Sequence, residues 1–437
     1  MHIGLGYDSL SMKTTPAKVW WDTRRLINGH VLIVGKSGTG KTHTLRNMVS
    51  QMSEQSGGKI RVHVMDVHGD IDLDGASTVK FSESTPYGFN PLTINPDPDF
   101  GGVRKRIQSF MAALSRTQFK LGSRQEAALR NILLDLYAAN GFREDDASTW
   151  RIDSSQRTKR KQPAMEDAVR FAQAKLRSMF LGTSSRTVAA LEKLYRKQIQ
   201  FQSKLKNSHK ALSADEKASL EQDIEKLTKD ALDLFAEHMA TIQTGRELDD
   251  LIKYDSKEVM KSVVERLENL LNIGIFRPQR PPFDPNASIW RYDIKALSTD
   301  EKRLFVSFIC EAIFLRATQR GVQDDVVELI ILDEAHLFSS DEPDNPVNVI
   351  AKEARKFGLG LFAASQSPTH FSDDFISNVG TKIVLGIDQL FWNGTVQKLK
   401  IGQNALEWII PHKRMIVQMN NKGENKNAPI WVVLDKN

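Results

Sequence analysis

The chain has 437 residues, a formal net charge of +6 and a hydrophobic content of 40%, which is ordinary for a soluble globular protein with about two or three domains. Its single cysteine, Cys310, excludes an internal disulfide framework and any cysteine-based metal site. No apolar run reaches the roughly 18 residues of a membrane helix, so we expect a cytoplasmic protein without an integral membrane segment.

The first informative element is a strand followed by a glycine-rich loop. Residues 30–34 predict a buried strand, and residues 35–42 match the phosphate-binding pattern G-x-x-x-x-G-K-[ST]. Glycines allow several backbone N–H groups to converge on one phosphate, where a Cβ atom would block the approach. The pattern predicts ATP and Mg²⁺ as cofactors, with Lys41 at the β- and γ-phosphates and the Thr42 hydroxyl on Mg²⁺. The loop residues expected to contact the nucleotide are Gly35, Lys36, Ser37, Gly38, Thr39, Gly40, Lys41 and Thr42.

Two proline-rich stretches divide the chain. They cover residues 94–102 and 277–285, and neither can continue a helix or a central strand. We therefore predict three segments, which are 1–100 as the first part of an ATPase core, 101–285 as a helical insertion domain, and 286–437 as the second part of the core.

The predicted insertion is helical and basic. A capping box at residues 213–216 opens a helix with apolar residues at Leu220, Ile224, Leu227, Ala231 and Leu234, and a helix over 189–206 would pair with it. Residues 101–210 contain 23 Lys and Arg against 9 Asp and Glu. This concentration of charge fits a solvated helical surface, and equally a surface that faces a polyanion such as nucleic acid.

Outside the insertion, short β-branched runs alternate with helical patterns, which predicts an α/β fold with a mainly parallel sheet. Ser298 and Glu301 form a capping box, and Gly321 is expected to end the helix that it opens. The last two predicted strands should form an antiparallel hairpin at the sheet edge. The predicted strands are 31–34, 62–66, 289–293, 327–332, 359–364, 382–387, 415–418 and 430–434.

A strand that ends in two acids supplies the other half of a hydrolysis site. Asp333 and Glu334 directly follow residues 326–332, a mostly apolar stretch that predicts a buried strand. Functional groups of parallel sheets gather at the carboxyl ends of the strands, so Asp333 is expected to hold Mg²⁺ beside Thr42 and Glu334 to orient and deprotonate the attacking water. One acid after a strand could cap a helix. Two acids in a chain with a phosphate-binding loop favour hydrolysis over binding alone.

Two further residues are candidates for the same reaction. Gln366 follows the strand 359–364 and is placed to sense the γ-phosphate or the water. Arg355 lies at the end of the helix predicted over 347–357. Its charge there either complements the helix dipole or acts as an arginine finger in the site of a neighbouring subunit.

Four motifs in order resemble the HerA branch of the HerA/FtsK superfamily. The resemblance implies RecA-like ATPases that form rings, usually hexamers, translocate on double-stranded DNA and often serve a partner nuclease such as NurA or an antiphage effector. It gives Lys41 and Thr42 the nucleotide and Mg²⁺ roles, makes Asp333 and Glu334 the Walker B pair, makes Gln366 the sensor and Arg355 the trans-acting finger, and places Asp66 near the nucleotide. The motifs are residues 28–34 leading into the phosphate-binding loop, 66–70, 332–336, and 354–358 followed by 365–368.

Two departures from that family keep other functions open. Archaeal HerA proteins carry a small β-barrel ahead of the ATPase, whereas here about thirty residues precede the phosphate-binding loop. Residues 87–92, Tyr-Gly-Phe-Asn-Pro-Leu, resemble a motif of TraG-like conjugation ATPases. The sequence therefore predicts a DNA translocase, with two alternatives: a conjugation or secretion motor that moves protein or DNA, and an ATP-gated scaffold that regulates an effector.

Overall fold

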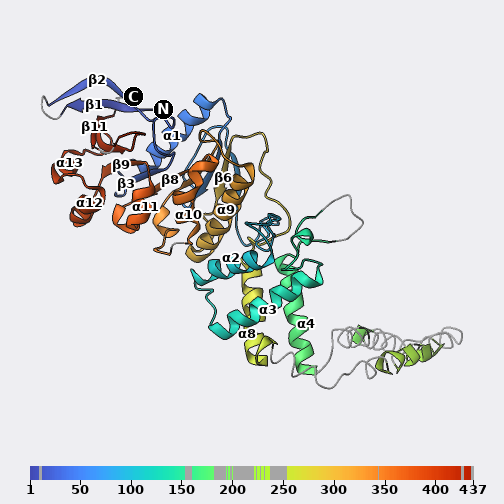
Figure 1. The fold of residues 1–437 in the computed structure, drawn as a ribbon. Helices are drawn as coiled ribbons and strands as arrows, with labels where there is room; N and C mark the ends of the chain where they lie inside the picture. Colours follow the sequence, from blue (N-terminus) through green and yellow to red (C-terminus); the bar gives the residue numbers. More distant parts are fainter. Residues whose placement is uncertain are drawn as a thin grey trace, which may run out of the picture. The chain divides into compact units, whose positions relative to one another are not determined.

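The computed structural model describes the chain except for residues 9–11, 153–159, 343, 425–427 and 435–437, and between residues 182 and 252 it describes only part of the chain. Among the helices that it describes, none is both long enough and apolar enough to cross a membrane. The chain divides into two compact units (Figure 1). The first unit comprises residues 1–89, 116–118 and 273–437, and the second comprises 90–115 and 119–272. Residues 273–285 thus belong with the first unit.

The first unit is built on one sheet of 11 strands in the order β2-β1-β11-β10-β9-β3-β8-β7-β4-β6-β5. The strands from β9 to β5 are mutually parallel, and those from β9 through β10, β11 and β1 to β2 pair antiparallel. The strand bounds are His2–Asp8 (β1), Lys13–Trp20 (β2), Val31–Gly35 (β3), Arg61–Asp66 (β4), Ser77–Lys80 (β5), Ile289–Asp293 (β6), Glu328–Leu332 (β7), Leu359–Ser365 (β8), Thr381–Gly386 (β9), Arg414–Met419 (β10) and Ile430–Val433 (β11).

The predicted α/β class is confirmed, and all eight predicted strands are present. The sheet has three more strands, β1, β2 and β5, which the sequence did not indicate. The predicted position of the final hairpin is wrong. Strands β10 and β11 do pair antiparallel, but β1 and β2 extend the sheet beyond β11, so β2 is the edge strand.

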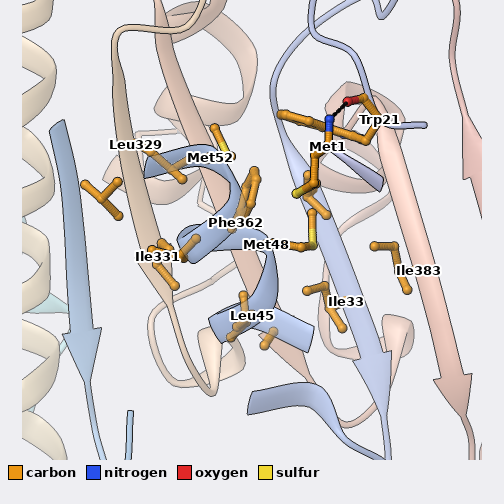
Figure 2. Packing of buried hydrophobic residues seen from close by; sticks show 14 of the residues in the cluster. Met1, Trp21, Ile33, Leu45, Met48, Met52, Leu329, Ile331, Phe362 and Ile383 are labelled. Atoms are coloured by element: carbon orange, nitrogen blue, oxygen red, sulfur yellow. Dashed lines mark hydrogen bonds between the residues drawn. The ribbon is translucent and has the colours of Figure 1, made fainter. Parts of the chain in front are cut away.

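Helix α1 (Lys41–Ser56) covers one face of the sheet. Its buried residues Leu45, Met48 and Met52 belong to the same hydrophobic cluster as Ile33 of β3 and Phe362 of β8 (Figure 2). Alternate residues of these strands point to this face, as the pleat requires. This packing fixes the amino end of α1 at the carboxyl end of β3, where the phosphate-binding loop joins the two elements.

The opposite face is covered by α9 (Thr299–Arg320). Phe305 of α9 packs with Phe81 and with Tyr292 of β6. Ile289 lies three positions before Tyr292, hence on the other face of the strand, and belongs to the cluster on the α1 face. The predicted capping box is confirmed, because the Ser298 hydroxyl accepts from the Glu301 N–H, and Gly321 follows the last helical residue. The remaining helices of this unit are α10 (Pro346–Glu353), α11 (Asp373–Asn378), α12 (Trp392–Leu399) and α13 (Gln403–Trp408).

The second unit is helical in its described part. Its helices are α2 (Val103–Ser115), α3 (Ser123–Ala139), α4 (Met165–Leu181) and α8 (Lys257–Asn272), and α8 packs against both α3 and α4. Ile132 of α3 and Val263 of α8 are fully buried. The predicted capping box at 213–216 lies outside the described residues, and so does most of the helix predicted at 189–206. The described positions between 221 and 236 are helical, as predicted for the helix from Leu220 onward.

Candidate nucleotide site

The phosphate-binding loop has the backbone shape that its glycines predict. Gly38 and Gly40 lie in the left-handed region, with φ of 77° and 95°. A Cβ atom on Gly35 would lie 2.4 Å from the Thr39 hydroxyl, so this position also requires glycine. The Thr39 hydroxyl itself donates to the Lys36 carbonyl at 2.8 Å. The backbone of the loop therefore curls into a concave shape, which residues with larger side chains could not adopt at these positions.

The loop presents positive charge to an anion. Lys41 is buried, and its ammonium donates to the Gly35 carbonyl at 2.8 Å, which lays the side chain along the loop. Helix α1 begins after Gly40 without a side-chain cap and without an acid in its first turn. The positive end of the helix dipole is thus not neutralised from within the helix, as at anion sites built on helix amino ends.

The two acids predicted after β7 lie at the same sheet edge. Asp333 is 3% exposed, and burial together with the neighbouring Glu334 carboxylate raises the pKa of Asp333 to about 6. Glu334 has a φ of 49°, uncommon for a residue other than glycine. The His336 imidazole lowers the pKa of Glu334, against the effect of burial, and the positive charge of Lys41 lowers it further. The structure therefore brings Lys41, which we expect to bind phosphate, and Glu334, the predicted catalytic base, close enough for their charges to interact.

Gln366 extends from the strand between these two motifs. Strand β8 pairs with β3 on one side and with β7 on the other, all parallel. Its last residue, Ser365, is paired with Val34, one residue before the phosphate-binding loop. Gln366 follows Ser365 and is exposed. Three adjacent parallel strands thus carry the loop, Gln366 and the acids to one edge of the sheet.

Arg355 lies at the other edge. The helix predicted over 347–357 is an α-helix that ends at Glu353, followed by a 3-10 turn over Ala354–Phe357 that contains Arg355. The turn precedes β8, whereas Gln366 follows it, and seven strand residues separate the two edges by about 20 Å. Arg355 is exposed and cannot reach the phosphate-binding loop of its own chain.

Asp66 has a local role in the structure. It is fully buried, and its carboxylate accepts from the N–H groups of Gly69 and Ile71 at 2.7 and 3.0 Å and from Arg291 Nε at 2.8 Å. These bonds hold the loop that contains His68. Because both carboxylate oxygens have partners within the chain, we infer that Asp66 positions this loop instead of contacting the nucleotide directly.

Two histidines lie at this edge, and the sequence alone did not indicate a role for either of them. The His336 Nδ1 atom lies 3.2 Å from the Glu334 carboxylate, although the pair lacks the alignment of a hydrogen bond. The His336 ring is 5.1 Å from that of His370, and His370 Nδ1 lies 3.0 Å from the Ser365 hydroxyl. The sequence offered one signal for His336, which is its position two residues after Glu334 in the motif Leu-Asp-Glu-Ala-His. No comparable motif points to His370, which the fold places beside His336.

A cavity of about 540 Å³ in this unit is distinct from these residues. It is lined by residues before β3 and β7 and at the end of α1, among them Trp21, Met52 and Val326. These segments lie at the edge opposite the phosphate-binding loop, so the cavity takes no part in the candidate site.

Comparisons with known proteins agree with this geometry. Residues 8–313 match the family model described as the central domain of helicase HerA. The match includes the phosphate-binding loop and ends before β7. The chain is 30% identical over 152 residues to a probable helicase of Methanocaldococcus jannaschii, covering 31% of this chain and 29% of that protein.

Two further proteins are similar. The chain is 41% identical over 63 residues, or 14% of its length, to the DNA double-strand break repair helicase HerA of Pyrococcus furiosus, and the match covers 11% of that protein. The matched regions therefore span less than a third of each of these relatives. The structure of VirB4 from Thermoanaerobacter pseudethanolicus aligns over 100% of this chain and 96% of its own, with a TM-score of 0.61 and 13% identity. At that identity the likeness shows a common fold.

Proposed function

The chain belongs to the HerA helicase family, and on that premise we propose that it is an ATP-hydrolysing motor that forms a ring, of six subunits, and moves along double-stranded DNA. The observation that carries this proposal is the division of the site between two sheet edges. Lys41, Glu334 and Gln366 belong to one edge, whereas Arg355 lies at the other. A complete site then needs two subunits.

The residues present suit ATP with Mg²⁺. The left-handed glycines and the uncapped start of α1 form a cradle for phosphates, with Lys41 beside it. Thr42 and Asp333 offer oxygen ligands, and the Asp333 carboxylate is buried beside that of Glu334, where a cation would offset the two like charges. Among the described residues, no cluster of three or more acids, histidines or cysteines could hold a metal. Mg²⁺ usually takes one or two carboxylates with phosphates and waters, so this donor set fits it.

The proposed reaction assigns one task to each side chain. Lys41 and the loop amides bind the β- and γ-phosphates, and Mg²⁺ would neutralise charge on them. Glu334, kept ionised by its lowered pKa, orients a water molecule and accepts its proton as the oxygen attacks the γ-phosphorus. The bond to the β-phosphate oxygen breaks, which releases ADP and phosphate. Gln366 senses the γ-phosphate, and Arg355 of a neighbouring subunit stabilises the charge of the transition state.

Double-stranded DNA is the proposed substrate, and a nuclease or another antiphage effector is the proposed partner. The basic bias of residues 101–210 supports contact with a phosphate backbone. The test is ATP hydrolysis with and without duplex DNA, with Glu334→Gln as the blank for contaminating activity. We expect duplex DNA to raise the rate severalfold and added salt to abolish the increase. A rate that ignores duplex DNA, together with no DNA retention at low salt, would exclude the proposal.

The conjugation or secretion motor is the second candidate, favoured by the motif at residues 87–92. In the structure this motif has a packing role. A Cβ atom on Gly88 would lie 2.1 Å from the Ile275 carbonyl, and Phe89 packs edge to face on Phe276. Because packing explains these residues, we rank this candidate below DNA translocation. Co-fractionation with membranes would favour it, whereas a stable complex with a separate protein and no translocation would favour the ATP-gated scaffold.

A further inference from the structure

A tight turn near the end of the chain lies against the phosphate-binding loop. It connects α13 to β10, and the N–H of Arg414 donates to the Ile410 carbonyl at 2.8 Å across it. His412, within the turn, has a φ of 62°. A left-handed backbone is costly for a residue with a side chain, so the surrounding hydrogen bonds must hold it in place. These residues lie outside the region matched by the family model, which ends at residue 313.

His412 contacts both left-handed glycines of the loop. Its Nε2 atom lies 2.8 Å from the Gly38 carbonyl oxygen, and a Cβ atom on Gly40 would lie 3.2 Å from its ring. A carbonyl oxygen can only accept, so Nε2 carries the proton. Pro411 approaches Gly386 at the end of β9, where an added Cβ atom would lie 3.6 Å from the proline ring. The turn thus supports the loop from outside, and glycine at position 40 leaves room for the imidazole.

The geometry of a peptide unit gives this contact a consequence. The Gly38 carbonyl and the Thr39 N–H belong to one planar trans peptide and point in opposite directions. In this structure the Thr39 N–H donates to the Lys36 carbonyl at 3.3 Å, so a donor that holds the Gly38 carbonyl from outside keeps the peptide in the orientation that closes this bond within the loop. A hydrogen bond to the carbonyl also polarises the N–H of the same peptide, which makes it a better donor.

We propose that His412 is a positioning residue for nucleotide binding, which fixes the Gly38–Thr39 peptide and with it the curl of the phosphate-binding loop. This inference rests on the proposed function, because it requires that the loop bind a nucleotide. His412 is exposed, and its contact is with the loop backbone. Its replacement should therefore affect phosphate binding far more than folding.

The test compares three substitutions in the full chain by titration with ADP and Mg²⁺ and by steady-state ATP hydrolysis. His412→Ala and His412→Phe remove the donor, and Phe keeps a ring over Gly40. His412→Gln places an amide N–H near the position of Nε2. We expect Kd and KM to rise about five- to tenfold for Ala and Phe, as for loss of one hydrogen bond, with kcat nearly unchanged and with Gln restoring most of the affinity.

The matched control is Lys413→Ala, an exposed neighbour in the same turn, which should bind like the wild type. Equal affinity of His412→Ala and the wild type would overturn the inference, as would equal loss in Gln and Phe. If His412→Ala does not fold, the comparison of His412→Gln with His412→Phe still tests the inference. Failure of the wild-type chain to bind nucleotide would instead overturn the proposed function, so the two failures are distinguishable.

Discussion

Arg355 and Gln366 stand at opposite ends of the same strand, β8, Arg355 in the turn that precedes Leu359 and Gln366 directly after Ser365. Two residues assigned to one reaction are therefore separated by the length of a strand, about 20 Å. Within a single chain they cannot act on one γ-phosphate. In a ring, the edge that carries Arg355 on one subunit can face the edge that carries Gln366 on the next.

Arg355→Ala should lower kcat by about 10³, the lower range for arginine fingers, while each subunit stays folded. Because the residue is proposed to act in the neighbouring site, mixing Arg355→Ala with Lys41→Ala subunits should restore part of the activity. Some interfaces then pair an intact Lys41 with an intact Arg355. The measurement is the ATPase rate of mixtures at a constant total concentration.

Lys356→Ala is the control for Arg355, because Lys356 is an exposed cation in the same turn. Its substitution should leave kcat close to that of the wild type. Mixtures that are never more active than their components, under conditions where subunits exchange, would contradict a role in trans.

Glu334→Gln should retain nucleotide and lose turnover. The amide keeps the size of the side chain and can still contact the water, but it cannot accept the proton, so kcat should fall by about 10² to 10⁴. Nucleotide affinity should remain within about threefold, since phosphate binding depends on Lys41 and the loop. Glu353→Gln, an exposed acid before the Arg355 turn, is the control. Normal turnover by Glu334→Gln would remove Glu334 as the general base.

Lys41→Ala should act at the earlier step. Its ammonium is buried against the loop and bonded to the Gly35 carbonyl, so its loss removes both the charge for the phosphates and a contact that shapes the loop. We expect nucleotide affinity to fall by at least about tenfold, as for loss of a charged hydrogen bond. Equilibrium titration with ADP and Mg²⁺ separates this result from that of Glu334→Gln. Unchanged affinity would show that the loop amides suffice.

The central sheet could be predicted from the sequence because its strands are buried on both faces. All five residues of β3 and of β7 are buried, and apart from Glu328 these strands are continuous apolar runs that stand out in the sequence. Strand β2 could not be found in this way. Its burial pattern is mostly exposed, and its pairing with β1 provides its backbone partners.

The residues of the candidate site could likewise be predicted only where they occur in local sequence motifs. Lys41, Asp333 and Glu334 occur in local motifs whose spacing carries the chemistry, so the sequence suffices to select them. His412 contacts Gly38, which lies more than 370 residues earlier in the chain, and no periodicity or spacing reports such a contact. The contact of Asp66 with Arg291 could not be predicted either, because Arg291 comes from a strand more than 200 residues later.

The buried side chain of His30 makes the folding stability depend on pH. It precedes β3, it is fully buried, and neither ring nitrogen has a hydrogen-bond partner in the described part of the chain. Burial, with a smaller effect of the Arg355 charge, lowers the pKa of His30 to about 4 from its usual 6.5. Between these values the unfolded chain binds a proton that the folded chain does not. The contribution to stability is therefore complete above pH 6.5 and is lost as the pH falls toward 4.

We predict that the wild type loses about 2 kcal/mol of folding free energy through His30 between pH 7.5 and pH 5. His30→Leu should remove this loss, because leucine fills similar space and has no proton to bind. The measurement is urea unfolding of both proteins at the two pH values. Other titrating groups affect both proteins equally, so the difference between the two pH dependences isolates His30. Parallel pH dependences would mean that His30 has a buried partner or that the site admits water, and either result would also remove the reason for its low pKa.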